Sequence, residues 1–193
     1  MSVISKSEAR SFYKGIREGF PHEAKSDLDR IIAEKLFDLD EYKNRDTLLA
    51  FVSKGIEVDT SAIIAKAFSD GKTVAVPRCD SESNTMTFYV IKSRGDLESG
   101  YFGLLEPKTD CQRLDSFEGS ICLVPGLCYD ANGYRVGFGK GFYDRFLNDY
   151  TGVSVGVCYS ECIAEKLPKD EFDRPVDILI TDNRIYRKDK GYG

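Results

Sequence analysis

The sequence has one histidine, no Cys-x-x-Cys pair and no long apolar run among its 193 residues. The single histidine, His22, argues against a His-dependent catalytic triad and against a metal centre rich in histidine. Without a Cys-x-x-Cys pair, a structural zinc site has little support. No stretch approaches ~18 uninterrupted apolar residues, and residues 1–15 lack the apolar core of a signal peptide. We therefore expect a cytoplasmic protein that does not enter a membrane.

Positive charge is also scarce, because 27 Lys and Arg residues stand against 32 Asp and Glu residues, giving a net charge of −5. An acidic chain gains nothing from approaching nucleic acid or an anionic membrane, so neither is predicted as a partner. If the protein binds an anion, it must do so where basic residues cluster locally. The six cysteines follow no secretory signal and several lie in apolar runs, which favours reduced structural thiols.

The length and composition predict one domain that covers residues 1–193. Helices are predicted at 5–20, at 26–42, from Asp59 or Thr60 to Gly71, and at 141–150. Strands are predicted at 47–52, 73–76, 86–91, 121–124, 153–158 and 176–180. Pro21 should separate the first two helices, Pro77 should end the second strand, and residues 95–107 should form a surface loop.

Several of the predicted strands are largely apolar and lack a regular alternation with polar residues, notably 121–124, 153–158 and 176–180. Such strands are typical of a parallel sheet that is covered by helices on both faces. The sequence therefore predicts a layered α/β fold with a mostly parallel central sheet flanked by helices, in a Rossmann-like three-layer architecture.

A glycine-rich segment lies between the strand at 121–124 and the helix at 141–150. Gly137, Gly139 and Gly141 occupy alternate positions there, where backbone N–H groups and a helix N-terminus can receive a phosphate. The flanking Arg135 and Lys140 can donate to phosphate oxygens, and Asp144 can bind Mg²⁺ together with those phosphates. The spacing matches neither the dinucleotide-binding fingerprint nor the P-loop, so a purely structural turn remains the alternative.

The segment around this loop resembles the diagnostic block of the 5-formyltetrahydrofolate cyclo-ligase family, also called methenyltetrahydrofolate synthetases. The matching residues of the block are Pro125-Gly126, Tyr129-Asp130, Gly133, 135–137 (RVG), 139–141 (GKG), Tyr143-Asp144 and Leu147. Further landmarks agree in order and spacing: Lys6, Arg10, 57–60 (EVDT), Pro77, 86–88 (MTF), 103–107 (GLLEP), Leu167-Pro168, Asp173 and Val176-Asp177. The resemblance covers most of the chain.

The resemblance implies an enzyme that uses ATP and Mg²⁺ to convert 5-formyltetrahydrofolate into 5,10-methenyltetrahydrofolate, releasing ADP and phosphate. A formamide oxygen is a poor leaving group. Phosphorylation of that oxygen would make the formyl carbon electrophilic and allow ring closure by N10. The main tasks of such an enzyme are to position the reactants and to neutralise charge.

The resemblance also implies roles for individual residues. It implies nucleotide contacts for Lys6, Arg10, Arg135, Gly137, Gly139, Lys140 and Gly141, and Mg²⁺ ligation by Asp144 and Asp173. It implies folate contacts for Val52, Glu57, Phe138 and Tyr143. The expected catalytic residues are Lys140, Arg135 and Tyr143.

Simpler interpretations of these residues remain open. Lys6 and Arg10 could form a solvated helix face, Asp173 could be an exposed loop charge, and Tyr143 could only pack its helix. Phe138, Phe142 and Cys162 depart from the family pattern, which leaves substrate affinity open. The alternative function is a non-catalytic nucleotide- or folate-binding protein. We expect a monomer, but the sequence leaves the oligomeric state and the number of glutamates on the preferred folate undetermined.

Overall fold

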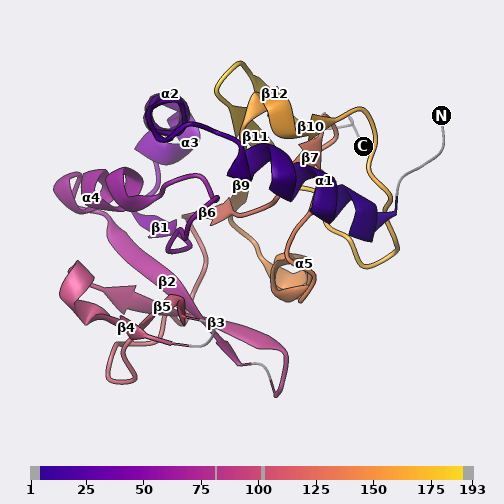
Figure 1. The fold of residues 1–193 in the computed structure, drawn as a ribbon. Helices are drawn as coiled ribbons and strands as arrows, with labels where there is room; N and C mark the ends of the chain where they lie inside the picture. Colours follow the sequence, from indigo (N-terminus) through magenta and orange to yellow (C-terminus); the bar gives the residue numbers. More distant parts are fainter. Residues whose placement is uncertain (1–4, 81, 101–102, 189–193) are drawn as a thin grey trace.

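A seven-stranded, mostly parallel sheet forms the centre of the molecule, with strand order β12-β11-β9-β6-β1-β2-β3 (Figure 1). The computed structural model describes residues 5–80, 82–100 and 103–188. The sheet strands are β1 (Thr47–Leu49), β2 (Thr73–Asp80), β3 (Thr85–Ile91), β6 (Ser120–Val124), β9 (Val153–Cys158), β11 (Ile178–Thr181) and β12 (Ile185–Arg187). The five inner strands pair in parallel, and the edge strands β3 and β12 pair antiparallel. This confirms the predicted architecture.

Helices cover both faces of the sheet. They are α1 (Lys6–Glu18), α2 (His22–Asp38), α3 (Asp40–Lys43), α4 (Ser61–Ser69) and α5 (Phe142–Asp149). The connection from β1 to β2 through α4 and the connection from β6 to β9 through α5 run in opposite directions along the sheet. Because parallel crossovers are right-handed, α4 and α5 lie on opposite faces. Helices α2 and α4 contact each other and so share one face.

The sequence correctly indicated that the inner strands would be buried on both sides. Every residue of β6 and β11 is buried, as are all but the first residue of β9. Four cysteines, Cys122, Cys128, Cys158 and Cys162, are buried among these strands and their neighbours, and all six cysteines are free thiols. No helix in the described ranges combines the length and apolar character needed to cross a membrane.

Two predictions about loops and prolines were wrong. Pro77 does not end β2, which continues to Asp80 and pairs Pro77 with Phe88 of β3. Since β1 pairs only with residues 73–75, β2 has a neighbour on one side alone at Pro77, where a missing N–H is tolerated. The expected surface loop at 95–107 contains a short antiparallel pair, β4 (Leu97–Ser99) and β5 (Leu105–Pro107), after the 3₁₀ turn η1 (Arg94–Asp96).

Other boundaries also shifted. The first strand ends at Leu49, three residues earlier than predicted, and the helix predicted at 26–42 begins at His22 and breaks at Leu39, whose ψ of 134° is extended. A second small sheet, β10-β7-β8, was not predicted at all. Its strands are β7 (Cys128–Asp130), β8 (Arg135–Val136) and β10 (Ile163–Ala164), the last after the 3₁₀ turn η3 (Ser160–Cys162). It carries the chain from β6 to the glycine-rich loop.

Candidate active site

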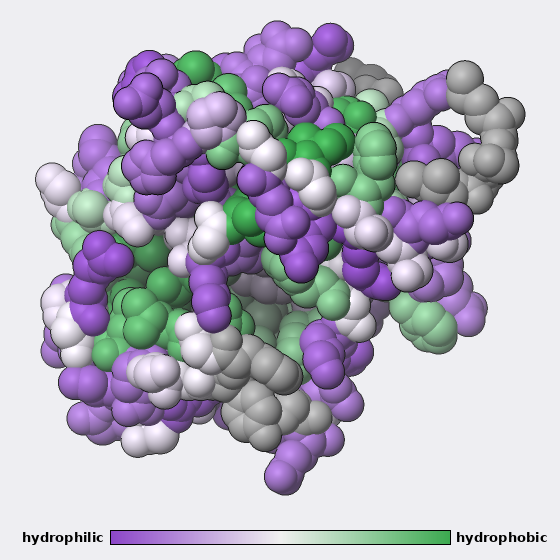
Figure 2. All heavy atoms as spheres, in the orientation of Figure 1, coloured by the Kyte–Doolittle hydropathy of each residue, from purple (hydrophilic) through white to green (hydrophobic). Residues whose placement is uncertain are grey.

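A large cleft of about 1530 Å³ opens beyond the carboxyl ends of β1 and β6. Phe51 and Val52, just after β1, and Pro125, just after β6, line it. These adjacent strands lead to helices on opposite faces, and such a switch in direction leaves a crevice where α/β proteins bind ligands. Figure 2 shows the corresponding hollow near the centre of the molecule.

Every residue predicted for the site lines this one cleft. The set is Lys6, Arg10, Val52, Glu57, Arg135, Gly137, Phe138, Gly139, Lys140, Gly141, Tyr143, Asp144 and Asp173. They come from α1, from the loop after β1, from β8 through the glycine-rich loop into the first turn of α5, and from the segment before β11. The fold therefore gathers the set, although co-location does not test the role of each residue.

The glycine-rich loop turns into α5 through two residues that need positive φ. Gly139 has φ 98° and Gly141, the N-cap of α5, has φ 68°. Residues with a side chain rarely adopt these angles, so glycine is required at both positions. Arg10 of α1 fixes the loop from the other side, because its Nε donates to the carbonyl oxygen of Gly137 over 2.9 Å. The loop is thus held at the start of a helix, the geometry that favours phosphate.

Arg135 and Asp144 form an ion pair, with 3.0 Å between Nη2 and Oδ1, and the Arg135 side chain is 4% exposed. The Nη1 of Arg135 also donates to the carbonyl oxygen of Arg174 over 2.9 Å. The backbone N–H of Arg174 in turn donates to Oδ1 of Asp144 over 3.3 Å. These bonds tie α5 and β8 to the segment that contains Asp173.

Lys6 bridges that segment to α1. Its Nζ lies 2.6 Å from Oδ2 of Asp173 and 2.8 Å from Oδ2 of Asp170. Burial by itself would lower the pKa of Lys6, but the hydrogen bonds and charges of Asp170 and Asp173 outweigh it and raise the pKa. Each predicted Mg²⁺ ligand is therefore paired with a predicted phosphate-binding cation.

The two aspartates fit a metal only if a ligand supplies the other oxygens. Within the described residues, no group of three or more His, Cys, Asp or Glu side chains could hold a metal ion. Mg²⁺ commonly takes one or two carboxylates and completes its octahedron with phosphate oxygens and water. Asp144 accepts a hydrogen bond from the N–H of Arg174, the chain neighbour of Asp173, and both aspartates line the cleft, which suits that arrangement.

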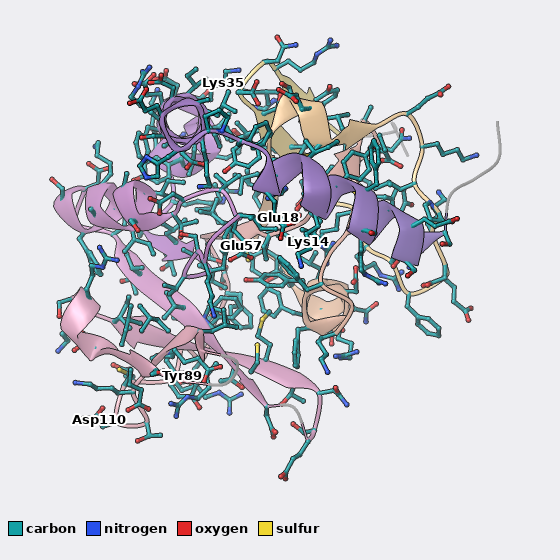
Figure 3. The ribbon with its side chains drawn as sticks, in the orientation of Figure 1. Lys14, Glu18, Lys35, Glu57, Tyr89 and Asp110 are labelled. Atoms are coloured by element: carbon teal, nitrogen blue, oxygen red, sulfur yellow. The ribbon has the colours of Figure 1, made fainter. Side chains whose placement is uncertain are left out.

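The opposite wall of the cleft is mostly apolar and includes Val52, Pro77, Cys79 and Leu104. Glu57 lies with Val52 in the loop after β1 and lines the same cleft; in Figure 3 it is labelled below Glu18 and beside Lys14 of α1. Burial raises the pKa of Glu57, although its Oε2 accepts a 2.8 Å hydrogen bond from the N–H of Lys54. A carboxylate in such a place can accept hydrogen bonds from a heterocycle that displaces the remaining water.

Tyr143 also lines the cleft, and its hydroxyl group is the notable feature. The hydroxyl is buried and has no hydrogen-bond partner among the described residues, and burial raises the pKa of this phenol well above its usual value. A buried hydroxyl without a partner is costly. Helix packing alone would not explain it, whereas a ligand that supplies a hydrogen bond would.

Sequence reasoning missed several residues that shape the cleft. Arg145 donates from Nη2 to the carbonyl oxygen of Lys140 over 2.7 Å and so supports the glycine-rich loop. Glu106 is 7% exposed, lines the cleft, and lies 3.6 Å from Nε of Arg78. Its position in the GLLEP landmark was the only signal. Nothing local singled out Arg145, because its partners are backbone carbonyl oxygens, that of Lys140 and, through Nε over 2.9 Å, that of Asn84.

Residues 3–182 match the model of the 5-formyltetrahydrofolate cyclo-ligase family. The chain belongs to this family. A 5-formyltetrahydrofolate cyclo-ligase of Escherichia coli K12 is 29% identical over 150 residues, which cover 72% of this chain and 80% of that protein. The corresponding protein of Mus musculus is 27% identical over 168 residues, covering 78% of this chain and 80% of the mouse protein.

Solved structures agree with the family assignment. The NMR structure of Aquifex aeolicus 5,10-methenyltetrahydrofolate synthetase superposes with a TM-score of 0.86 and 32% identity, covering 97% of this chain and 95% of that one. The synthetase from Mycoplasma pneumoniae, with a TM-score of 0.76 and 21% identity, shows the same fold. This member of the cyclo-ligase family is therefore an enzyme of the ligase class that acts in folate one-carbon metabolism.

Proposed function

We propose that this enzyme couples ATP hydrolysis, with Mg²⁺, to the conversion of 5-formyltetrahydrofolate into 5,10-methenyltetrahydrofolate. The observation that supports the proposal is that a charged wall and an apolar wall line the same cleft. One wall offers paired cations, carboxylates and a glycine-rich helix start, and the other is apolar with buried hydrogen-bonding groups. A nucleoside triphosphate suits the first wall, and a reduced pterin suits the second.

On the charged wall, Lys6, Arg10, Arg135 and Lys140 neutralise phosphate oxygens, and residues 137–141 let the backbone approach them. Asp144 and Asp173 hold Mg²⁺, which when bound supplies positive charge to the terminal phosphates. Because both carboxylates already accept bonds from cations, phosphates would take over the partners that the carboxylates release. The cations then exchange carboxylate partners for phosphate partners, and no charge is left unpaired.

On the folate side, Val52 of the apolar wall and the exposed Phe138 side chain of the glycine-rich loop pack against the folate, and Glu57 accepts from the amino and N–H groups of its pterin. The hydroxyl of Tyr143 gains its missing hydrogen-bond partner from the substrate. This arrangement sets the formyl group at the boundary between the two walls, next to the terminal phosphate.

The proposed reaction is balanced in two steps. The formyl oxygen attacks the γ-phosphorus, and the bond from that phosphorus to the bridging oxygen breaks to release ADP. N10 then attacks the formyl carbon, the carbon–oxygen bond breaks to release phosphate, and the N10 proton passes to water. Arg135 and Lys140 stabilise the transferring phosphoryl group, and Tyr143 orients the reacting substrate.

The purified protein tests this proposal directly. With ATP, Mg²⁺ and 5-formyltetrahydrofolate, we expect the absorbance of the methenyl product to appear, together with one ADP per product. Omission of ATP or of Mg²⁺ should each abolish the signal. Tight nucleotide and folate binding without product would instead favour the non-catalytic binding protein. Product formation without ADP would contradict the phosphorylation step.

The whole chain should act as one unit. Within the described ranges, one hydrophobic core cluster reaches from Ala9 of α1 to Ile180 of β11, and the family model spans almost the same residues. This continuity supports the proposal that residues 1–193 form one cyclo-ligase domain.

A further inference from the structure

The segment that carries Glu57 has no regular secondary structure of its own. Residues 53–59 lie between β1 and α4 and form neither a strand nor a helix. We call this segment the Glu57 loop. Because no sheet ladder or helix fixes its backbone, its position depends on the side chains that contact it from other elements.

Arg17 of α1 and Tyr159, which follows β9, contact the backbone of the Glu57 loop. Nη1 of Arg17 donates to the carbonyl oxygen of Ile56 over 3.1 Å, and the hydroxyl of Tyr159 lies 3.2 Å from the carbonyl oxygen of Glu57. The guanidinium also lies over the Tyr159 ring, with its central carbon 5.0 Å from the ring centre. Both side chains are buried, and they pack together against this part of the loop.

Asp29 of α2 completes the contacts with the Glu57 loop. Its Oδ1 accepts from the N–H of Asp59 over 3.1 Å and from the hydroxyl of Tyr159 over 2.7 Å. Its Oδ2 is paired with Nζ of Lys25, also over 2.7 Å. A phenol has one proton, so its short bond to the carboxylate is the stronger one and the more distant backbone carbonyl receives a weaker share. The loop is therefore held on both sides of Glu57.

Arg17 also links the Glu57 loop to the segment that follows β6. Its Nη2 donates to the carbonyl oxygen of Gly126 over 2.6 Å, and its Nε donates to that of Leu127 over 2.9 Å. Pro125, the chain neighbour of Gly126, lines the cleft. One buried guanidinium thus holds together the segments that leave two adjacent strands, β1 and β6, where the cleft opens.

We propose that Arg17, Asp29 and Tyr159, together called the loop bracket, are positioning residues that set the Glu57 carboxylate against the pterin of the folate. This inference rests on the proposed contact between Glu57 and the folate. None of the three lines the cleft, so they act through the loop. Burial raises the pKa of Glu57, and the charges of Arg17 and Lys25 oppose that rise, so both cations act on this carboxylate. A buried polar network whose members all have partners holds one backbone arrangement.

Tyr159→Phe tests the loop bracket, because it removes the hydroxyl and keeps the ring beside Arg17. We expect the dissociation constant for 5-formyltetrahydrofolate, measured by calorimetry without ATP, to rise about threefold, as for a weakened hydrogen bond. The KM for folate should rise with it, while kcat and the affinity for ATP stay the same. A general loss of structure would impair all of these together. Unchanged folate affinity would overturn the proposal.

Tyr42→Phe is the matched control. The buried hydroxyl of Tyr42 donates to Oδ2 of Asp70 over 2.9 Å, so its removal also costs a bond to a carboxylate, but Tyr42 does not line the cleft. Thermal unfolding should show similar losses of stability in the two variants, whereas only Tyr159→Phe should weaken folate binding. Equal weakening in both variants would mean that affinity follows stability, which would overturn the positioning role.

A double-mutant cycle with Glu57→Gln shows whether the loop bracket acts through that carboxylate. We expect Tyr159→Phe to add little to the loss that Glu57→Gln causes alone, so the double variant should stay near the roughly threefold loss of either single variant. Independent effects would multiply to about ninefold and would overturn the proposal. No loss in Glu57→Gln would refute the pterin contact and the loop bracket with it. A protein that binds folate without forming product would refute only the proposed reaction.

Asp29 offers a conservative pair of variants. Asp29→Ala removes the acceptor for the Asp59 N–H and for the phenol, whereas Asp29→Asn keeps an oxygen there and loses the ion pair with Lys25. We expect the asparagine variant to retain more folate affinity than the alanine variant, although both lose stability. Equal losses of affinity would contradict positioning by these hydrogen bonds.

Discussion

The ionisable groups on the two walls of the main cleft have pKa shifts with different physical causes. On the charged wall, Lys6 is partly buried, yet Asp170 and Asp173 raise its pKa above the ordinary value. On the apolar wall, burial raises the pKa of Glu57, and the Lys54 N–H with the charges of Arg17 and Lys25 does not offset it. Ion pairing therefore sets the direction of the pKa shift on the charged wall, and desolvation sets it on the apolar wall.

This contrast suggests a division of labour within one cavity. Paired charges can be exchanged for phosphates and a metal at modest cost, because the partners are already oriented. Groups that still have hydrogen-bonding capacity to offer, such as the Glu57 carboxylate and the Tyr143 hydroxyl, gain most from a ligand that supplies hydrogen bonds. We therefore expect changes on the charged wall mainly to lower turnover and changes on the apolar wall mainly to weaken folate binding.

The largest effect is expected from Asp144→Asn on the charged wall. The amide keeps the size of the side chain and can still accept from Arg135, but it is a poor Mg²⁺ ligand, so kcat should fall about a thousandfold. The measurement is kcat as a function of Mg²⁺ concentration, with thermal unfolding to show that the fold is kept. Asp110→Asn, an exposed change that lies far from the cleft in Figure 3, is the matched control. Normal turnover and an unchanged Mg²⁺ requirement would refute the metal role.

Lys140→Ala should come next, with kcat lowered about a hundredfold, because one charge that stabilises the transferring phosphoryl group is lost. Steady-state rates measured against ATP and against folate separate the two substrates. Lys43→Ala, on the surface at the end of α3, provides the control for loss of one lysine. A rise in the folate KM alone, with kcat intact, would indicate that Lys140 binds the folate and does not stabilise the phosphoryl group.

Tyr143→Phe tests the apolar wall with two opposite readouts. Folate affinity should fall about tenfold, while the free energy of unfolding should stay the same or rise, because an unpartnered buried hydroxyl is removed. Tyr150→Phe is the comparison within the same helix region: its hydroxyl lies 2.9 Å from Oγ of Ser120, so its removal should lower stability and spare activity. Loss of stability in Tyr143→Phe would indicate a structural hydroxyl instead.

The smallest effect on activity is expected from Glu57→Gln, a rise in the folate KM of about threefold. Stability gives the clearer signal. Since the folded-state pKa of Glu57 lies above 4.5, its contribution is most favourable below pH 4.5 and declines as the pH rises through the folded-state value. The glutamine variant should therefore match the unmodified protein near pH 4 and be more stable at pH 7. Thermal unfolding at both pH values measures this, and parallel pH curves would contradict it.

The sequence predicted the inner sheet and the glycine-rich loop well, since both depend on local pattern. It failed at Pro77, because whether a proline ends a strand depends on how many neighbours that strand has at that point. It also missed β4, β5 and the β10-β7-β8 sheet, whose strands of two or three residues carry no periodic signal. For the site, the resemblance brought together residues such as Asp173 that have no distinguishing local pattern.

The sequence by itself determined the largely apolar strands that must be buried on both faces and the glycine-rich turn at 137–141 between a strand and a helix. Both follow from chemistry within a few residues of chain. Only the tertiary structure decided that Lys6 would meet Asp173, 167 residues away, and that Arg135 would meet Asp144 beside the backbone of Arg174. Such contacts depend on the order of the strands and the handedness of the crossovers, which place distant segments at one end of the sheet.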